Sequence, residues 1–186
     1  MRERGYRVEG IIIKRINCGE ADKILTIFTL QRGKICCLAK GIRKICSRRA
    51  PACELFNKIS AYIIKGRTLD LVAEVKTLTQ FSNLSKKLRF VSSAYYLVEL
   101  VERLTAENQE NWLIYSLLSK ALEKVNQGEG FSEEDFVRFQ KELLVNLGFG
   151  LPYKISKATL DNHIETILDR KINSNGFINL WASFRT

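Results

Sequence analysis

The spacing of apolar residues changes once along this chain of 186 residues, near residue 80, and that change constrains the fold more than any other feature. Before it, apolar and polar residues alternate in short β-branched runs, which is the two-residue period of β-strands. After it, residues such as Phe90, Ala94 and Val98 recur at helical spacing. The pattern predicts the α+β class, with an all-β domain over residues 1–80 and an all-α domain over residues 81–186.

The first domain contains five strand-like runs, and turns containing Gly33 and Gly66 join two pairs of them. Five strands in about 80 residues, with tight hairpin turns, predict a small closed barrel of the OB-fold type. A barrel of this size needs side chains to fill it, and Phe28 is the aromatic residue that we expect to be buried. The predicted strands are residues 6–15, 23–30, 34–42, 55–65 and 69–78.

The second domain is predicted to be a bundle of helices. Ser132, followed by three acidic residues, is typical of a helix N-cap, and Gly148 and Gly150 suit the end of the same helix. The predicted helices cover residues 82–104, 110–125, 132–147 and 156–173, with a short terminal segment over 177–184.

Charge is distributed unequally between the two domains. Residues 1–80 contain 17 Lys or Arg and 7 Asp or Glu, whereas residues 81–186 contain 13 of each kind. The formal net charge of +10 therefore lies entirely on the predicted barrel. Such asymmetry favours two units with different tasks, one of which meets an anion.

The cations are densest in residues 31–49, where seven Lys or Arg occur without any acidic residue. Like charges held close together destabilise a folded protein unless a partner neutralises them. A cationic groove with aromatic side chains nearby is how OB-folds hold single strands, so nucleic acid is the expected anion. The primary candidates for phosphate contact are Lys40, Arg43, Lys44, Arg48 and Arg49, and the secondary candidates are Lys14, Arg15, Lys23, Arg32, Lys34, Lys65 and Arg67.

Other classes of function have weaker support in the sequence. The only histidine, His163, has no second metal ligand or orienting partner at helical spacing, and no P-loop or dinucleotide fingerprint occurs. The five cysteines suggest reduced thiols rather than a disulfide framework or a zinc site. No apolar run is long enough for a membrane span, which needs about 20 residues, and the charged start does not resemble a signal peptide. We expect a cytoplasmic protein with no catalytic residues, metal or cofactor, and no membrane partner.

Three alternatives remain open at this point. The first is an OB-fold protein that binds RNA. The second is a metal-dependent nuclease, because Asp70, Glu74 and Lys76 lie on one face of a predicted strand and loosely resemble the acid–acid–lysine set of such enzymes. The third is a protein adaptor whose basic face meets acidic tails.

A family resemblance favours DNA as the nucleic acid that the barrel binds, over these three alternatives. The segment YRVEGIIIKRINCGEADKILTIFTLQRGKICCLAKGIRK, residues 6–44, resembles the opening of the bacterial RecO family of recombination mediators. The matching elements are EGIII at 9–13, GEADKI at 19–24, Thr29 with Gly33-Lys34, and AKGIR at 39–43. Residues 62–76, 94–101 and 139–150 are similar to later parts of the same family.

The resemblance implies an OB-fold that binds DNA, a helical domain, and a role without turnover. That role is to anneal complementary strands and to help load recombinase onto DNA covered by single-strand-binding protein, at the nucleoid. The implied partners are single-stranded DNA first and double-stranded DNA second, the C-terminal tail of single-strand-binding protein, and RecR. Many members carry a four-cysteine zinc insert after the segment corresponding to LGFG, but this chain has no cysteine after Cys53.

Overall fold

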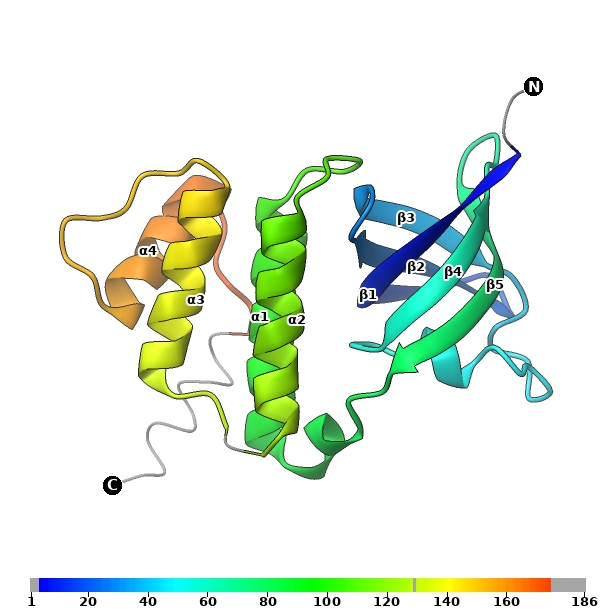
Figure 1. The fold of residues 1–186 in the computed structure, drawn as a ribbon, viewed down its shortest axis with the longest axis horizontal. Helices are drawn as coiled ribbons and strands as arrows, with labels where there is room; N and C mark the ends of the chain where they lie inside the picture. The colour runs from blue at the N-terminus through cyan, green and yellow to red at the C-terminus, as the bar shows by residue number, and fades with distance from the viewer. Residues whose placement is uncertain (1–3, 129, 175–186) are drawn as a thin grey trace. The chain divides into compact units, whose positions relative to one another are not determined.

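The computed structural model describes residues 4–128 and 130–174 and divides the chain into two units. The first unit contains residues 1–80 and 106–115, and the second contains residues 81–105 and 116–186. Figure 1 shows the strands of the first unit and the helices of the second.

The first unit is a closed barrel of five strands, as the alternating pattern predicted. Its strands are neighbours in the order β1-β2-β3-β5-β4, the order of an OB-fold, and β3 and β5 are the one parallel pair among them. Phe28 is fully buried, as expected. The strands are β1 (Gly5–Cys18), β2 (Asp22–Thr29), β3 (Gly33–Ala39), β4 (Lys58–Ile64) and β5 (Asp70–Thr79), with a short 3-10 helix, η1 (Pro51–Cys53), before β4.

The long strand β1 closes the barrel because it pairs on both sides. Its first half is antiparallel to β4 and its second half to β2, with a bulge between Ile12 and Lys14. A bulge bends a strand and re-aims its side chains, which explains how the three consecutive residues Ile11, Ile12 and Ile13 are all buried.

Residues 106–115 pack on the barrel, although the sequence pattern placed them in the helical domain. The backbone N–H of Asn108 donates to the carbonyl of Lys34 at 2.8 Å, and the Cys36 thiol donates to Glu107 at 3.5 Å. A side chain at Gly33 would meet the Gln109 carbonyl oxygen at 1.8 Å, so only glycine permits this approach. Contacts between residues so distant in the sequence leave no local pattern, and the prediction of a simple division at residue 80 missed them.

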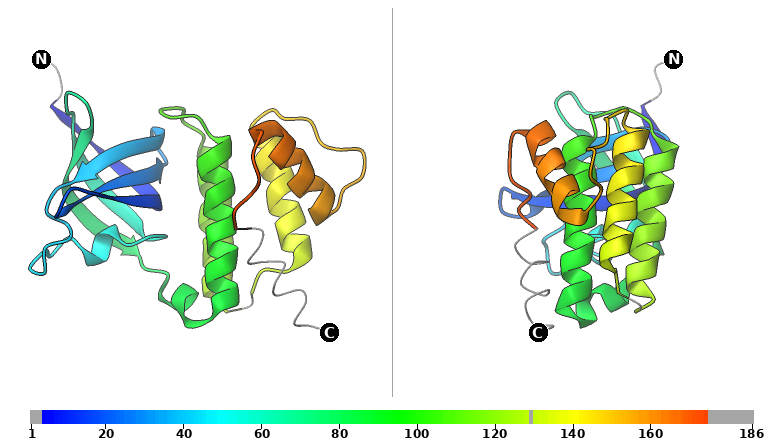
Figure 2. Two further views of the ribbon diagram at one scale, coloured as in Figure 1. Left: turned by 180° about the vertical axis from the view of Figure 1, so that it is seen from behind. Right: turned by 90° about the vertical axis from the view of Figure 1, so that its left-hand side faces the viewer.

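Within the described residues, the second unit is a bundle of four α-helices, the second of which begins in the first unit. Figure 2 shows α1 and α2 side by side, with α3 and α4 forming a second layer over them. The buried apolar residues recur along α1 at the spacing that predicted the helix. The helices are α1 (Leu88–Leu104), α2 (Trp112–Asn126), α3 (Glu133–Asn146) and α4 (Lys157–Leu168), preceded by a 3-10 helix, η2 (Ser82–Lys86).

The ends of α3 follow the predicted signals. Ser132 caps the helix by accepting from the N–H of Asp135, whose side chain accepts in return from the Ser132 N–H. At the other end, Gly148 adopts a left-handed conformation with φ of 81°. The helix therefore begins and ends where the sequence indicated.

The prediction for α4 was too long, because the helix ends at Leu168 rather than at Asn173. Asp169 is left-handed, with φ of 50°, and the N–H of Arg170 donates to the Glu165 carbonyl. This is a Schellman-type ending with aspartate in the position that glycine usually takes. The terminal segment predicted over 177–184 lies outside the described residues.

Two further observations concern membrane spans and the cysteines. No helix in the described parts of the chain is both long and apolar enough to span a membrane. The five cysteines are free, with Cys37 and Cys53 buried and Cys46 exposed. Burial raises the pKa of the Cys37 thiol to about 12 and that of Cys53 to about 11, so both thiols are protonated at neutral pH.

Candidate nucleic-acid interface

The densest group of cations lies on the segment that joins β3 to β4. We call residues 40–50 the basic loop. Successive turns fold it, with the N–H of Lys44 donating to the Gly41 carbonyl and the N–H of Ser47 donating to the Lys44 carbonyl. Gly41 has φ of 66°, a left-handed conformation that starts the loop at the end of β3.

The base of the basic loop is anchored to the turn between β1 and β2. The N–H of Gly41 donates to the Asp22 carboxylate at 2.7 Å, and the N–H of Arg43 donates to the Ala21 carbonyl at 2.8 Å. The Arg43 guanidinium also donates to the Gly19 carbonyl at 3.1 Å. These contacts join the sequence elements GEAD (residues 19–22) and AKGIR (residues 39–43). Both elements are therefore needed to hold the base of the basic loop against the β1–β2 turn.

Four of the five primary candidates project from the basic loop into solvent. Lys40, Arg43, Lys44 and Arg48 are all exposed. Within the described residues, the side chains of Lys40, Lys44 and Arg48 form no hydrogen bond or ion pair. Exposed cations that nothing in the fold neutralises are available to an external anion.

The fifth primary candidate, Arg49, has a different position. Its guanidinium donates to the carbonyl oxygens of Val72 at 2.8 Å, Ala73 at 3.3 Å and Lys40 at 2.6 Å. Arg49 therefore fastens the basic loop to β5, and both terminal nitrogens of its guanidinium already donate to backbone carbonyls. Phosphate contact is not the role that this geometry favours for Arg49.

Two of the secondary candidates are also held inside the unit. Lys34 is buried beneath residues 107–109, with a relative exposure of 9%. Arg15 forms an ion pair with Glu54 at 2.6 Å and donates to the Cys53 carbonyl at 3.4 Å. Burial does not favour phosphate contact for Lys34, because residues 107–109 pack against this part of β3.

A second group of cations surrounds Tyr6. The Tyr6 hydroxyl donates to Asp70 at 2.6 Å, and the Arg32 guanidinium lies 4.1 Å from the centre of the Tyr6 ring. Burial and the neighbouring carboxylate raise the pKa of Tyr6, so its hydroxyl keeps the proton that it donates. Asp70 also accepts from the N–H of Gly66, which ties the turn carrying the exposed cations Lys65 and Arg67 to this cluster.

The secondary candidates therefore separate into two groups. Lys23 pairs with Ala39 across the β2–β3 ladder and is next to the basic loop. Lys14 is exposed on β1. Arg32, Lys65 and Arg67 belong instead to the turns around Tyr6.

The predicted set of contact residues does not include every exposed cation of the barrel, and Arg7 is an example. Arg7 lies on the outer face of β1, 5.9 Å from the centre of the Tyr62 ring and 3.5 Å from Glu74. The alternation of β1 places Arg7 outward, opposite the buried Val8, and that signal was present in the sequence.

The acidic residues of β5 do not form the arrangement considered for a nuclease. The pairing of β4 with β5 contains a register shift. Tyr62 pairs with Glu74, but the next residue, Ile63, pairs with Val72. The extra residue, Ala73, puts Asp70 and Glu74 on opposite faces, contrary to the prediction of one shared face. No three His, Cys, Asp or Glu side chains in residues 4–128 and 130–174 gather as a metal site would require.

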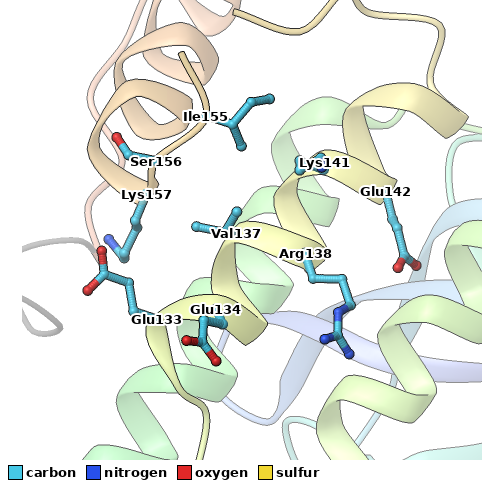
Figure 3. A pocket seen from close by; sticks show the side chains of 9 residues that line it. All are labelled: Glu133, Glu134, Val137, Arg138, Lys141, Glu142, Ile155, Ser156 and Lys157. Carbon is cyan, nitrogen blue, oxygen red and sulfur yellow. The ribbon is translucent and has the colours of Figure 1, made fainter.

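The helical unit offers a different kind of surface. An open pocket of about 630 Å³ lies between α3 and the start of α4, and Figure 3 shows the side chains that line it. Its lining carries three acids and three cations, so it has no preference for a polyanion. The charged lining residues are Glu133, Glu134, Arg138, Lys141, Glu142 and Lys157.

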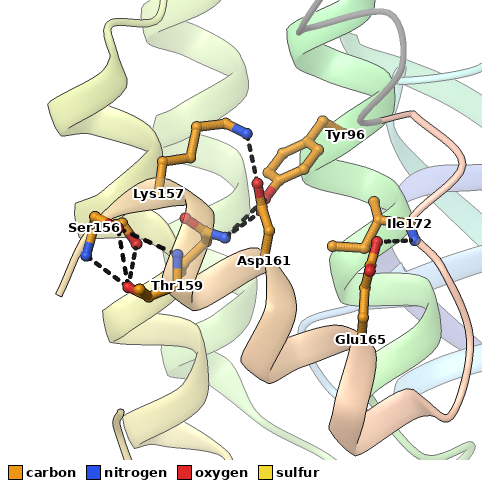
Figure 4. Close-up of polar contacts among 8 residues, drawn as sticks. Tyr96, Ser156, Lys157, Thr159, Asp161, Glu165 and Ile172 are labelled. Carbon is orange, nitrogen blue, oxygen red and sulfur yellow. Dashed lines mark hydrogen bonds and ion pairs between the residues drawn. The ribbon is translucent and has the colours of Figure 1, made fainter. Parts of the chain in front are cut away.

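The interior of the helical unit contains a polar network that joins three helices. Asp161 accepts hydrogen bonds from the Tyr96 hydroxyl, from Gln140 at 2.7 Å and from Lys157 at 2.7 Å (Figure 4). Burial and the Asp161 charge raise the pKa of Tyr96 well above its ordinary value. His163, the only histidine, contacts the Gly150 carbonyl and is only partly buried.

An OB-fold barrel followed by a helical bundle, with unneutralised cations on the barrel, is the class of protein that the fold defines. The family model for the N-terminal part of recombination protein O matches residues 1–81, and the model for its C-terminal part matches residues 86–154. The chain belongs to this RecO family.

Individual relatives agree with the family models. The DNA repair protein RecO of Roseiflexus sp. is 41% identical over 69% of this chain and 45% of its own length. Its counterpart in Symbiobacterium thermophilum is 34% identical over 77% of this chain and 57% of its own length. The DNA repair protein RecO of Geobacter metallireducens is 30% identical over 92% of this chain and 70% of its own length. The chain thus spans about half the length of the first two relatives.

Proposed function

We propose that this chain acts in bacterial DNA repair as a non-enzymatic mediator that binds single-stranded DNA through the basic loop. The observation that carries the proposal is that Lys40, Arg43, Lys44 and Arg48 are exposed on a loop that hydrogen bonds fasten to an OB-fold barrel. OB-folds bind single strands in positively charged grooves, mainly through phosphate neutralisation and base stacking. The relatives that match the chain are named DNA repair proteins.

Phosphate neutralisation is also the physical basis of strand annealing. Two complementary strands repel each other through their phosphates, and a cationic surface reduces this repulsion as they approach. An annealing factor needs no nucleophile, general base or metal. The proposal extends to helping recombinase load onto DNA covered by single-strand-binding protein, in the cytoplasm at the nucleoid, with the acidic tail of that protein and RecR as partners.

The proposal predicts contacts that are independent of sequence. Cations that contact phosphate position a strand without reading its bases, so removing them should weaken all sequences alike. Arg32 stacked on Tyr6 presents a second, pre-ordered cation that can meet the strand further along.

Equilibrium binding and strand annealing test the proposal together. The test variant changes Lys40, Arg43, Lys44 and Arg48 to Ala. Arg49 is left in place because it fastens the loop to β5. The control variant changes Lys120, Arg138, Lys154 and Arg170, which are exposed in the helical unit, so that both variants lose two Lys and two Arg.

We expect the test variant to bind a labelled single-stranded oligonucleotide at least tenfold more weakly than the wild type and to anneal complementary strands more slowly. The control variant should behave like the wild type. Equal loss in the two variants would mean that net charge alone drives binding, and no loss in either would refute the role of the basic loop. An RNA oligonucleotide of the same sequence should compete for binding no better than DNA. If RNA competes more strongly than DNA, the RNA-binding alternative is favoured.

A further inference from the structure

The turn at the tip of the basic loop carries an exposed apolar side chain among the cations. The turn from Lys44 to Ser47 is closed by a hydrogen bond of 2.9 Å between the Ser47 N–H and the Lys44 carbonyl. Its two central residues, Ile45 and Cys46, are exposed, and Ile45 is fully exposed. A fully exposed isoleucine thus occupies the turn at the middle of the loop, directly after Lys44 and near Arg48 in the sequence.

Folding makes no use of this apolar side chain. The free energy gained by removing an isoleucine from water is of the same size as that of a good hydrogen bond or better, and at Ile45 all of it is still available to a partner. A β-branched side chain is also stiff about its first torsion, so little rotational freedom is lost when it becomes enclosed.

The position of the tip is fixed by its base. Arg49 fastens the loop to β5 through three carbonyl oxygens, and the Asp22 carboxylate holds its start through the N–H of Gly41. Ile45 therefore projects from an anchored support. An apolar side chain on an anchored loop, between cations proposed to contact phosphate, suits insertion into a stack of bases better than loose surface contact.

We propose that Ile45 inserts between two neighbouring bases of the strand whose phosphates contact Lys44 and Arg48. This inference rests on the proposed function and adds base unstacking to it. Apolar side chains, isoleucine among them, serve as wedges between bases in other nucleic-acid complexes. Insertion would hold the strand with its bases separated at one step, and its contribution should not depend on salt because no charge is involved.

A fluorescent oligonucleotide tests the insertion directly. The probe is a single-stranded oligonucleotide with one 2-aminopurine, whose emission rises when its neighbours no longer stack on it. The variants are Ile45→Ser, Ile45→Leu and, as a control, Val145→Ser, which changes another exposed apolar residue in α3. The fully exposed position of Ile45 means that neither change there should alter the unfolding midpoint.

We expect emission to rise when the wild type binds. Ile45→Ser should bind about tenfold more weakly, equivalent to about 1.4 kcal/mol, with an unchanged salt dependence and no rise in emission. Ile45→Leu and Val145→Ser should retain both affinity and emission. Wild-type affinity in Ile45→Ser, or no emission change with the wild type, would overturn the insertion.

The same experiment separates this inference from the proposed function. If the variant lacking Lys40, Arg43, Lys44 and Arg48 loses binding while Ile45→Ser does not, the basic loop is the DNA site and insertion is wrong. If neither variant loses binding, both proposals fail.

Discussion

The two units of this chain differ in how their cations are grouped. Both units contain ion pairs of their own, as between Arg15 and Glu54 in the barrel and between Lys157 and Asp161 in the helical unit. In the barrel, Lys40, Lys44 and Arg48 point into solvent without a partner among the described residues. Removing one partner of a buried pair leaves an uncompensated charge and is destabilising, whereas exposed cations without a partner are available to bind an anion.

The same contrast occurs within the basic loop itself. Arg48 and Arg49 are neighbours in sequence, yet Arg48 is exposed and Arg49 donates to three backbone carbonyl oxygens. A cation count treats the two residues as equivalent. Their surroundings make one a candidate for binding and the other a support for the loop.

The largest effect on stability is expected at Lys157. Its side chain is 11% exposed and lies 2.7 Å from Asp161, whose side chain is 8% exposed. Lys157→Ala would leave a buried carboxylate without its cation, which typically costs about 3–5 kcal/mol. Urea unfolding followed by helical circular dichroism measures this loss.

Lys124 provides the matched control in the same unit. It lies 2.7 Å from Asp135, but its side chain is 40% exposed, so Lys124→Ala should cost only about 0–1 kcal/mol. Similar losses for the two variants would contradict the distinction between buried and exposed pairs.

A smaller effect on stability is expected at Arg49. Arg49→Ala removes three hydrogen bonds from a charged donor and should destabilise the barrel by about 1–3 kcal/mol. Arg48→Ala should change stability by less than about 0.5 kcal/mol, as surface substitutions usually do, and should weaken DNA binding instead. Thermal unfolding and binding assays on the two variants give the comparison, and a reversed order would show that the roles are exchanged.

The smallest effect on stability is expected at Asp135, and it appears as the pH is lowered. Burial tends to raise the pKa of Asp135, but hydrogen bonds from Lys124 and Ser132 outweigh it and hold the pKa below its usual value. A pKa lowered by folding contributes stability at higher pH, and that contribution is lost as the pH falls through the folded-state value. The unfolding midpoint of Asp135→Asn should therefore fall less than that of the wild type between about pH 5 and pH 2. A parallel fall in both proteins would contradict the assignment.

Local patterns in the sequence predicted much of the fold. The change of hydrophobic period separated strands from helices, and the cap at Ser132 and the glycine at 148 marked both ends of α3. Such signals act over a few residues, so they can be read without the tertiary structure. The end of α4 was missed because Asp169 adopts a left-handed conformation, which a sequence pattern normally assigns to glycine.

The departures from expectation at the candidate site have a common physical cause. Lys34 is buried by residues 107–109, and Arg49 is held by carbonyl groups of β5. The bulge at Ala73 separates Asp70 from Glu74, although their spacing in sequence suggested one face. Each departure arises from a contact or irregularity that only the folded chain creates.

The dependence of binding on salt tests the central claim most directly. Each phosphate contact to a single strand contributes about 0.7 to the slope of log affinity against log salt. Replacing Lys40, Arg43, Lys44 and Arg48 with Ala should therefore reduce the slope by about 2 to 3, while the matched change of Lys120, Arg138, Lys154 and Arg170 should leave it unchanged. A slope that is the same in the wild type and the basic-loop variant would contradict the claim that these exposed cations bind DNA.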